Sequence, residues 1–264
     1  MTTTTAPIPV RSPLPDGLAG GTVLIFGGSS GIGLAAGALL GSIGARTVLV
    51  GRDKGRLDAA VERVRDAGDG DVLGIAADIR DERAVTEVFE RTGAVDHVLH
   101  TAGGLTGAGP VAEMTRDTAG EAFDERLWSA LAIARAAVPR LGPGGSVTFS
   151  SGVLVTRPRP GMSAPLAAVG GVEALARALA VELAPRRLRV NAVRFGQFDT
   201  PLSRGAMGAD AGEAGDRAVA AAGSGTPLGR WGTADEAASA ALFLMANPYM
   251  TGEVLTVDGG FSLV

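Results

Sequence analysis

Several residue types that usually guide the search for a function are missing or rare in this chain of 264 residues. It has no cysteine, which excludes a disulfide framework and thiol chemistry. Its only histidines are His97 and His100, and this argues against a histidine-rich metal site. Lys54 and Tyr249 are the only lysine and the only tyrosine, so amine and phenol groups are scarce wherever a site lies.

Other shortages bound the class of protein. Aromatic residues make up only 4% of the chain, so its core must consist of Val, Leu, Ile and Ala, with 40 glycines available for tight turns. The formal net charge of −4 gives no electrostatic signature of nucleic-acid binding. No apolar run approaches the roughly 20 residues of a membrane span, and no signal peptide is visible. We therefore expect a cytoplasmic protein without nucleic-acid or membrane partners.

What is present begins with a glycine-rich turn. Apolar residues 22–26 precede the turn, and a helical pattern over 32–43 follows it. Glycines let the backbone approach a pyrophosphate, whose negative charge is favoured at the amino end of a helix. Glycine motifs also occur in ordinary strand–helix turns, so the turn alone leaves both interpretations open. The residues of the turn that could hold phosphate are Gly27, Ser29, Ser30, Gly31, Ile32 and Gly33.

Strand and helix patterns alternate along the rest of the chain. Strands are expected at 22–26, 46–50, 71–76, 95–100, 145–151, 188–193 and 254–257, and helices at 32–43, 55–67, 81–91, 117–140, 166–184 and 234–246. This alternation predicts an α/β fold in which a doubly wound parallel sheet carries helices on both faces. We expect one domain over 20–264, after a flexible lead-in at 1–19, with its ligand outside the carboxyl ends of the strands.

Further segments, in a fixed order, strengthen the argument from the turn. They are Asp78-Ile79, His100-Thr101-Ala102-Gly103, Asn191 to Gly196 with Phe195 in place of a usual proline, Thr200, and Thr251 to Gly260. Together with the turn, they resemble the short-chain dehydrogenase/reductase family from about residue 20 to 260. The resemblance implies a Rossmann-type single domain that transfers a hydride between NAD(P)(H) and a carbonyl or alcohol of a small molecule. It also implies a homodimer or homotetramer, formed through 117–140 and 166–184, and a substrate lid at about 201–230.

The resemblance assigns cofactor contacts to matching positions. The turn residues would hold the pyrophosphate, Asp78 and Ile79 the adenine, and Gly196 and Thr200 the nicotinamide side. Ala102 and Gly103 complete the expected cofactor site.

The end of the second strand bears on the choice of cofactor. NAD enzymes tend to place a carboxylate there, whereas this chain has Gly51 followed by Arg52. An arginine can hold the 2′-phosphate of NADP(H), so we favour NADP(H). Arg52 as a solvated loop residue is about as compatible with the sequence, and the neighbouring Asp53 keeps NAD(H) open.

The family's catalytic residues are absent. Counting back from Asn191 without gaps places the family's Tyr and Lys positions at Pro165 and Val169 and its Ser position at Gly152. The position of the family's Asn falls near Arg126. Proline cannot donate a proton, and valine can neither carry charge nor bind a ribose. The sequence therefore predicts a cofactor site without the usual Ser-Tyr-Lys apparatus.

Candidate replacements are weaker. His100 could act as acid or base near neutral pH, or it could be a structural residue behind the cofactor. Ser151 and Ser150 could bind a substrate carbonyl or cap the strand end. Arg126 could bind an anionic substrate or form a buried ion pair. Arg157 and Arg159 could bind a carboxylate or phosphate, but general exposure favours a solvated loop for them.

Two functions therefore remain. The chain could be an atypical oxidoreductase with a replacement acid or base, or with water in that role. Alternatively, it could bind a cofactor or ligand without redox turnover, or catalyse a non-redox reaction in the pocket that the family uses for its substrate.

Overall fold

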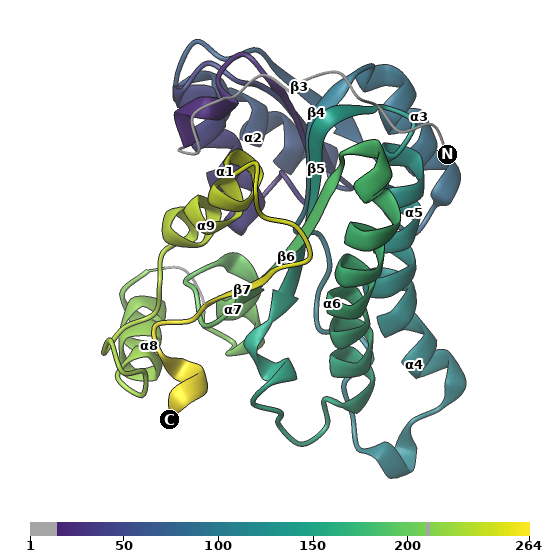
Figure 1. Ribbon diagram of the computed structural model, residues 1–264. Coiled ribbons are helices and arrows are strands. Elements are labelled where there is room, and N and C mark those ends of the chain that lie inside the picture. The colour runs from purple at the N-terminus through teal and green to yellow at the C-terminus, as the bar shows by residue number, and fades with distance from the viewer. Residues whose placement is uncertain (1–14, 210–211) are drawn as a thin grey trace.

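A computed structural model describes residues 15–209 and 212–264, and Figure 1 shows their arrangement. Within these residues lies one parallel sheet of seven strands in the order β3-β2-β1-β4-β5-β6-β7. The strands are β1 (Thr22–Phe26), β2 (Arg46–Gly51), β3 (Val72–Ala76), β4 (Val95–His100), β5 (Leu141–Gly152), β6 (Arg189–Phe195) and β7 (Val254–Val257). This confirms the predicted doubly wound α/β fold.

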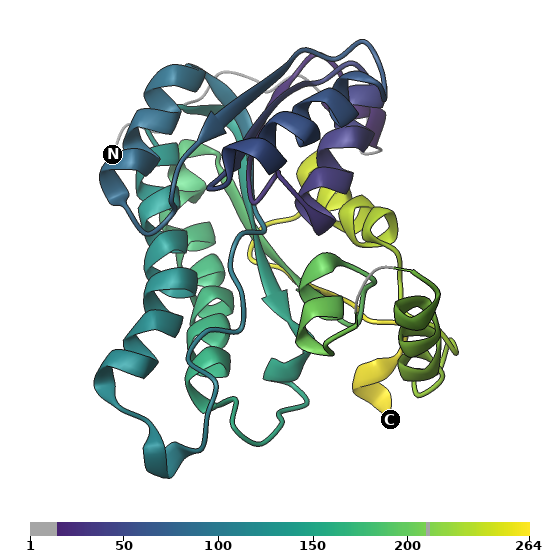
Figure 2. The same ribbon diagram turned by 180° about the vertical axis from the view of Figure 1, so that it is seen from behind.

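Two layers of helices cover the sheet, as the two opposite views show (Figures 1 and 2). One apolar core lies between the sheet and α1 (Gly31–Ser42), α2 (Lys54–Arg65) and α9 (Ala234–Ala246). A second core lies between the sheet and α3 (Glu82–Thr92), α5 (Ser129–Ala137) and α6 (Ser163–Leu183). Because both faces are covered, the central strands are runs of buried apolar residues rather than alternating patterns.

The strand order reverses next to β1, and this reversal positions the site. β1 pairs with β2 on one side and with β4 on the other, with Phe26 opposite His100. The glycine turn after β1 therefore lies beside the segment that follows β4. In such sheets the crevice outside the carboxyl ends at the reversal is the usual place for a ligand.

The helix expected over 117–140 is interrupted. The structure has α4 (Arg116–Phe123), a π-helical turn η3 (Asp124–Trp128), and then α5. The Ser129 hydroxyl donates to the Glu125 and Arg126 carbonyls, and the Arg126 side chain donates to the Gly104 carbonyl outside the helix. Side-chain bonds of this kind compete with the regular helical ladder, which no pattern of apolar residues reveals.

Ordered structure also begins earlier than the predicted domain start. A short 3₁₀ helix, η1 (Pro15–Leu18), buries Leu18 against the core, so the expected lead-in at 1–19 is wrong for its last residues. Residues 1–14 lie outside the described part of the chain. In the predicted lid, 201–230, the structure has α7 (Pro201–Ala206) and α8 (Glu213–Gly223), while 210–211 are outside the described residues.

Four short helical turns complete the description: η2 (Val111–Glu113), η4 (Val153–Val155), η5 (Ala184–Arg186) and η6 (Phe261–Leu263). In the part of the chain that the structure describes, every helix is too short or too polar to cross a membrane.

Candidate functional site

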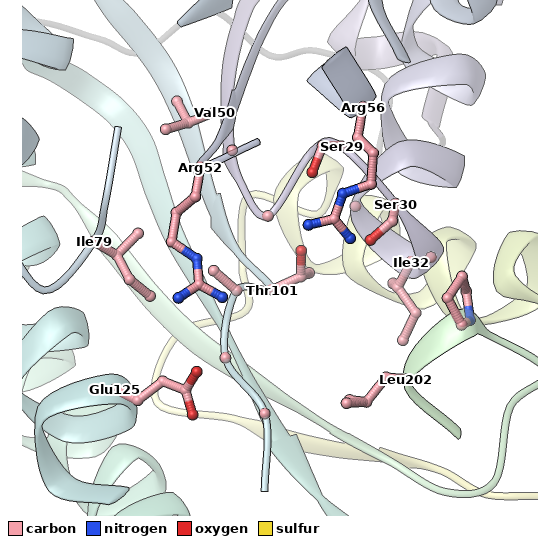
Figure 3. A pocket seen from close by; sticks show the side chains of 18 of the residues that line it. Ser29, Ser30, Ile32, Val50, Arg52, Arg56, Ile79, Thr101, Glu125 and Leu202 are labelled. Carbon is pink, nitrogen blue, oxygen red and sulfur yellow. The ribbon is translucent and has the colours of Figure 1, made fainter. Parts of the chain in front are cut away.

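A cavity of about 400 Å³ opens at the carboxyl ends of β1, β2, β3 and β4 (Figure 3). It brings together nearly all the residues that the sequence assigned to a cofactor. Those in its wall are Gly27, Ser29, Ser30, Gly31, Ile32, Gly33, Arg52, Asp78, Ile79, Ala102, Gly103 and Thr200. Gly196 is the exception, because it lines a neighbouring cavity instead.

The glycine turn forms one wall of this cavity, hereafter the first cavity. A Cβ atom added at Gly33 would lie 2.3 Å from the Gly27 carbonyl oxygen and 2.6 Å from Thr101 Oγ1, so only glycine fits there. This close contact fixes the start of α1 against the turn. The Ser30 side chain makes no capping hydrogen bond to α1. The amino end of the helix therefore offers its amide groups and positive dipole to an anion in the cavity.

Two arginines add positive charge to the same wall. Figure 3 shows Arg56 beside Ser29 and Ser30, and Arg52 pointing into the cavity between Ile79 and Thr101. Among the described residues Arg52 forms no ion pair, whereas Arg56 lies 3.7 Å from Asp53. Sequence reasoning missed Arg56, although it follows Arg52 by four residues at the start of a predicted helix.

The wall of this cavity also carries carboxylates that already have partners. The Arg80 guanidinium donates to Asp78 at 2.8 Å, and these hydrogen bonds lower the pKa of Asp78 below its ordinary value. Glu125 accepts a hydrogen bond of 2.5 Å from Thr106. Neither Arg80 nor Glu125 was predicted to lie at the site.

A second cavity of about 380 Å³ adjoins the first. The two share Ile32, Thr101, Gly103, Thr200 and Leu202. From the predicted site residues, the second cavity collects Arg126, Ser150, Ser151, Arg159 and Gly196. The first cavity therefore adjoins a second compartment on the side of Ile32, Thr101 and Thr200.

Comparison with known proteins agrees with this geometry. A family model described as "Enoyl-(Acyl carrier protein) reductase" matches residues 27–262. Carbonyl reductase family member 4 of Danio rerio is 34% identical over 245 residues, covering 91% of this chain and 98% of the relative. This chain belongs to the short-chain dehydrogenase/reductase family.

Another relative and two solved structures are also similar to this chain. A 3-oxoacyl-[acyl-carrier-protein] reductase of Bos taurus is 33% identical over 245 residues, covering 90% of this chain and 97% of the relative. The solved structure of MalC Reductase/Diels-Alderase from Malbranchea aurantiaca superimposes with a TM-score of 0.86 at 28% identity, covering 95% of this chain and 99% of that one. Levodione reductase superimposes with a TM-score of 0.85 at 28% identity, covering 94% and 99%.

This dehydrogenase/reductase has no tyrosine or lysine at either cavity. Pro165 lies in the first turn of α6 and Val169 one turn later; both are buried, and neither lines a cavity. Tyr249 is 98% exposed after α9, and Lys54 pairs with Asp58 on the surface of α2. The described part of the chain therefore brings neither a phenol nor an amine to the place where the family carries out proton transfer.

His100 does not reach the cavities either. Its side chain is buried, packs edge-on against Phe149 with 6.2 Å between ring centroids, and lines neither cavity. Neither ring nitrogen has a hydrogen-bond partner. Burial, together with the nearby charge of Arg126, lowers the pKa of His100 to about 3. The ring is therefore neutral at physiological pH, and this geometry disfavours the predicted acid/base role.

The two serines at the end of β5 differ. The Ser150 hydroxyl is buried without a partner. The Ser151 hydroxyl donates to Glu173 on α6 at 2.6 Å. Arg194 of β6 donates twice to the same carboxylate, at 2.8 and 2.6 Å, and once to Thr256.

Glu173 was not singled out from the sequence, although it follows Pro165 and Val169 at a spacing of four residues along one face of α6. Burial alone would raise the pKa of Glu173. The hydrogen bonds from Arg194 and Ser151 outweigh burial, so its pKa lies below its ordinary value. Glu173 is therefore ionised at neutral pH, and the proton of Ser151 is committed to it.

The three arginines predicted to meet substrate separate into two groups. Arg126 and Arg159 line the second cavity. Arg157 does not; it lies 4.4 Å from the centroid of the Phe261 ring and donates to the Phe261 carbonyl at 2.8 Å. Arg157 thus ties the carboxyl-terminal turn η6 to the loop after β5.

Proposed function

We propose that this protein is an NADP(H)-dependent oxidoreductase that acts on a carbonyl or alcohol group of a small molecule without the Ser-Tyr-Lys apparatus. The observation that carries the proposal is the pair of adjoining cavities, one built for a dinucleotide and the other largely apolar. When bound, NADP(H) supplies or accepts the hydride. The first cavity fits it, because Gly33 leaves room for close backbone approach and α1 offers its amino end.

The preference for NADP(H) rests on Arg52 and Arg56. A Cβ atom at Gly51 would lie 2.7 Å from Ser29 Oγ, which leaves no room for the carboxylate that binds the ribose of NAD(H). Arg52 has no ion pair among the described residues, and Arg56 lies beside Ser29 (Figure 3). The charge of Arg52, with Arg56 and its exposed partner Asp53 nearby, supports the proposal that a 2′-phosphate binds here.

Variants of these arginines test the preference. Replacing Arg52 and Arg56 together by Ala should weaken NADPH binding at least about tenfold, the effect of losing charge-assisted hydrogen bonds, and leave NADH binding nearly unchanged. Fluorescence titration of both nucleotides measures the two affinities. Lys54→Ala, which removes a charge from the same helix outside the cavity, is the matched control. Equal losses for NADPH and NADH would contradict the proposal.

Proton transfer needs a replacement group, and Ser151 is the candidate that the geometry supports best. Its own proton points to Glu173, so its oxygen can accept the proton of a substrate hydroxyl while its proton passes to the carboxylate. For alcohol oxidation, Ser151 would take the substrate O–H proton as its own proton moves to Glu173, and NADP⁺ held in the first cavity would supply the hydride acceptor. In the reverse direction, water supplies the proton.

The decisive experiment is an NADPH titration followed by turnover with a panel of ketones, aldehydes and alcohols. We expect cofactor binding and slow turnover that Ser151→Ala abolishes without weakening NADPH binding. Ser239→Ala, an exposed serine on α9, is the control. Tight binding with no turnover across the panel would overturn the redox proposal, and absent binding would overturn the cofactor assignment as well.

A second function has its own support. Pro165 and Val169 remove the two groups on which the family's redox chemistry depends. One structural neighbour is described as a Reductase/Diels-Alderase, a name that includes a reaction without hydride transfer. A protein of the present family that binds cofactor or ligand for non-redox chemistry therefore stays an alternative, which the same turnover panel distinguishes.

We also propose that the protein forms a homodimer or homotetramer. Exposed apolar residues on η3, α5 and α6 support this proposal, namely Trp128, Leu131 and Val181. Ala176 and Ala180 pack on the sheet and do not contribute to such a surface. Light scattering coupled to size-exclusion chromatography determines the assembly.

A further inference from the structure

The wall of the second cavity is mostly apolar. Its large apolar side chains include Leu105, Leu154, Phe195, Phe198, Met207 and Trp231. Its size of about 380 Å³ lies in the range of pockets for small organic ligands, about 300–1,000 Å³. A ligand that fills this space must therefore have a substantial apolar body.

The charges in this wall all have one sign. Arg126 and Arg159 are the charged residues among those that line it, and no aspartate or glutamate lies with them. Neither arginine forms an ion pair with a described carboxylate. The nearest acidic side chain along the chain, Glu125, lies in the wall of the first cavity and binds Thr106. Two positive charges in an apolar wall, without a carboxylate beside them, favour binding of an anionic ligand.

Arg126 is held in a fixed position. Its Nε and Nη2 atoms donate to the Gly104 carbonyl at 3.1 and 2.8 Å, and its side chain packs against Gly103. Burial lowers the pKa of Arg126, and the nearby charge of Glu125 offsets this lowering only in part. The Nη1 group has no hydrogen-bond partner among the described residues. Nη1 and the second N–H of Nη2 together form an end-on fork that matches the two oxygens of a carboxylate.

Arg159 is exposed and lies 6.0 Å from the centroid of the Phe261 ring. Its neighbour Arg157 lies closer to the same ring and donates to the Phe261 carbonyl, and Arg159 forms no ion pair with a described carboxylate. Arg159 thus contributes a second positive charge to the cavity, where it favours entry of an anion.

We propose that the second cavity binds an apolar molecule that carries one carboxylate, with the carboxylate on the Nη1/Nη2 fork of Arg126. This deepens the proposed function by naming the substrate class. A planar, two-oxygen anion suits the single fork of Arg126, whereas a phosphate would need further donors.

Calorimetric binding of three molecules with the same chain length tests the inference: octanoate, 1-octanol and octyl phosphate. We expect octanoate to bind at least about tenfold more tightly than 1-octanol, the gain of a charge-assisted bidentate contact. Equal affinities for octanoate and 1-octanol would overturn the proposal. Tighter binding of octyl phosphate than of octanoate would overturn the choice of carboxylate.

Variants assign the contact to Arg126. In Arg126→Gln the preference for octanoate should disappear while 1-octanol binds as before, which shows that the cavity is intact. Arg135→Gln, which removes an exposed charge of α5 paired with Glu82, should keep the full preference. A preference that survives in Arg126→Gln would contradict the assignment. If that variant loses 1-octanol binding, Arg126→Lys must still prefer octanoate for the proposal to stand.

These measurements need no hydride transfer, so they are separate from the test of the proposed function. Octanoate selectivity without turnover would support the proposed substrate class and refute the redox proposal. Turnover without octanoate selectivity would support the redox proposal and refute the substrate class.

Discussion

The two cavities meet at Thr101, yet main-chain groups dominate the wall of one and side chains dominate the wall of the other. In the first cavity the backbone of the glycine turn and the amino end of α1 are the main features, with arginines added at the edge. In the second, side chains dominate the wall, and the described residues that line it include no tyrosine or lysine.

This difference explains why one half of the site keeps its family pattern. Backbone amides can bind the phosphates of a cofactor regardless of which substrate lies in the second cavity. The geometry of the turn is therefore compatible with different reactions there. Proton transfer needs a particular group at a particular place, and its loss changes the reaction. The cofactor half should therefore tolerate changes in the other half, and the predictions below test that independence.

The largest effect is expected from Gly33→Ala in the first cavity. The new Cβ would lie 2.3 Å from the Gly27 carbonyl oxygen, which neither backbone segment can avoid. We expect a loss of about 3 kcal/mol in the free energy of unfolding, from overpacking, and no measurable NADPH binding. Urea denaturation and fluorescence titration check the two effects.

The control for this variant is Gly120→Ala on α4, where an added Cβ would meet nothing within 4 Å. Alanine is the better helix former, so this change should stabilise the protein by up to about 1 kcal/mol and leave NADPH binding unchanged. Normal NADPH binding by Gly33→Ala would refute the role of the turn.

The next effect, which is expected on stability alone, comes from Glu173→Ala behind the second cavity. The change leaves Arg194, whose side chain is only 16% exposed, without its ion-pair partner. We expect a loss of about 3 kcal/mol in the free energy of unfolding, with NADPH affinity unchanged because the first cavity is built separately. Weakened NADPH binding would show that the two cavities are coupled and would contradict their independence.

The pH dependence of this loss has a definite sign. Because the folded-state pKa of Glu173 is lowered, its contribution to stability is present above the ordinary glutamate pKa and is lost as pH falls through the folded value. The difference between wild type and Glu173→Ala should shrink on acidification. The exposed pair of Glu62 and Arg65 gives a control, since Glu62→Ala should change stability by less than about 1 kcal/mol.

Much of the fold follows from local patterns in the sequence. The predicted and observed bounds of β4 and β7 coincide, and α9 spans the predicted 234–246. These elements are apolar segments with clear starts and stops, such as the Thr233–Glu236 capping box of α9. The glycine turn could be predicted equally well, because its residues are neighbours in the chain.

What the sequence could not show depends on contacts between distant segments. The Arg126 side chain on η3 donates to the Gly104 carbonyl, 22 residues away. The partnership of Ser151, Glu173 and Arg194 requires β5 and β6 to pair with Ser151 opposite Arg194. Strand register and helix packing decide such contacts, and neither can be read from spacing along one strand.

His100 gives the last and smallest prediction, at the strand that borders both halves of the site. Its pKa of about 3 in the folded protein lies far below the ordinary value of 6.5, so the unfolded chain binds more protons between these values. Wild-type stability should therefore fall by about 2 kcal/mol more than that of His100→Leu when pH is lowered from neutral to about 5. At neutral pH the variant should differ by less than about 1 kcal/mol, since it removes two buried nitrogens that lack partners. Urea denaturation at both pH values measures the change, and turnover should be unaffected. Two outcomes would contradict this. The variant could show the wild-type pH dependence, or it could lose turnover while still binding NADPH. Either result would show that the ring takes up protons in the folded protein and would restore His100 as the acid/base of the second cavity.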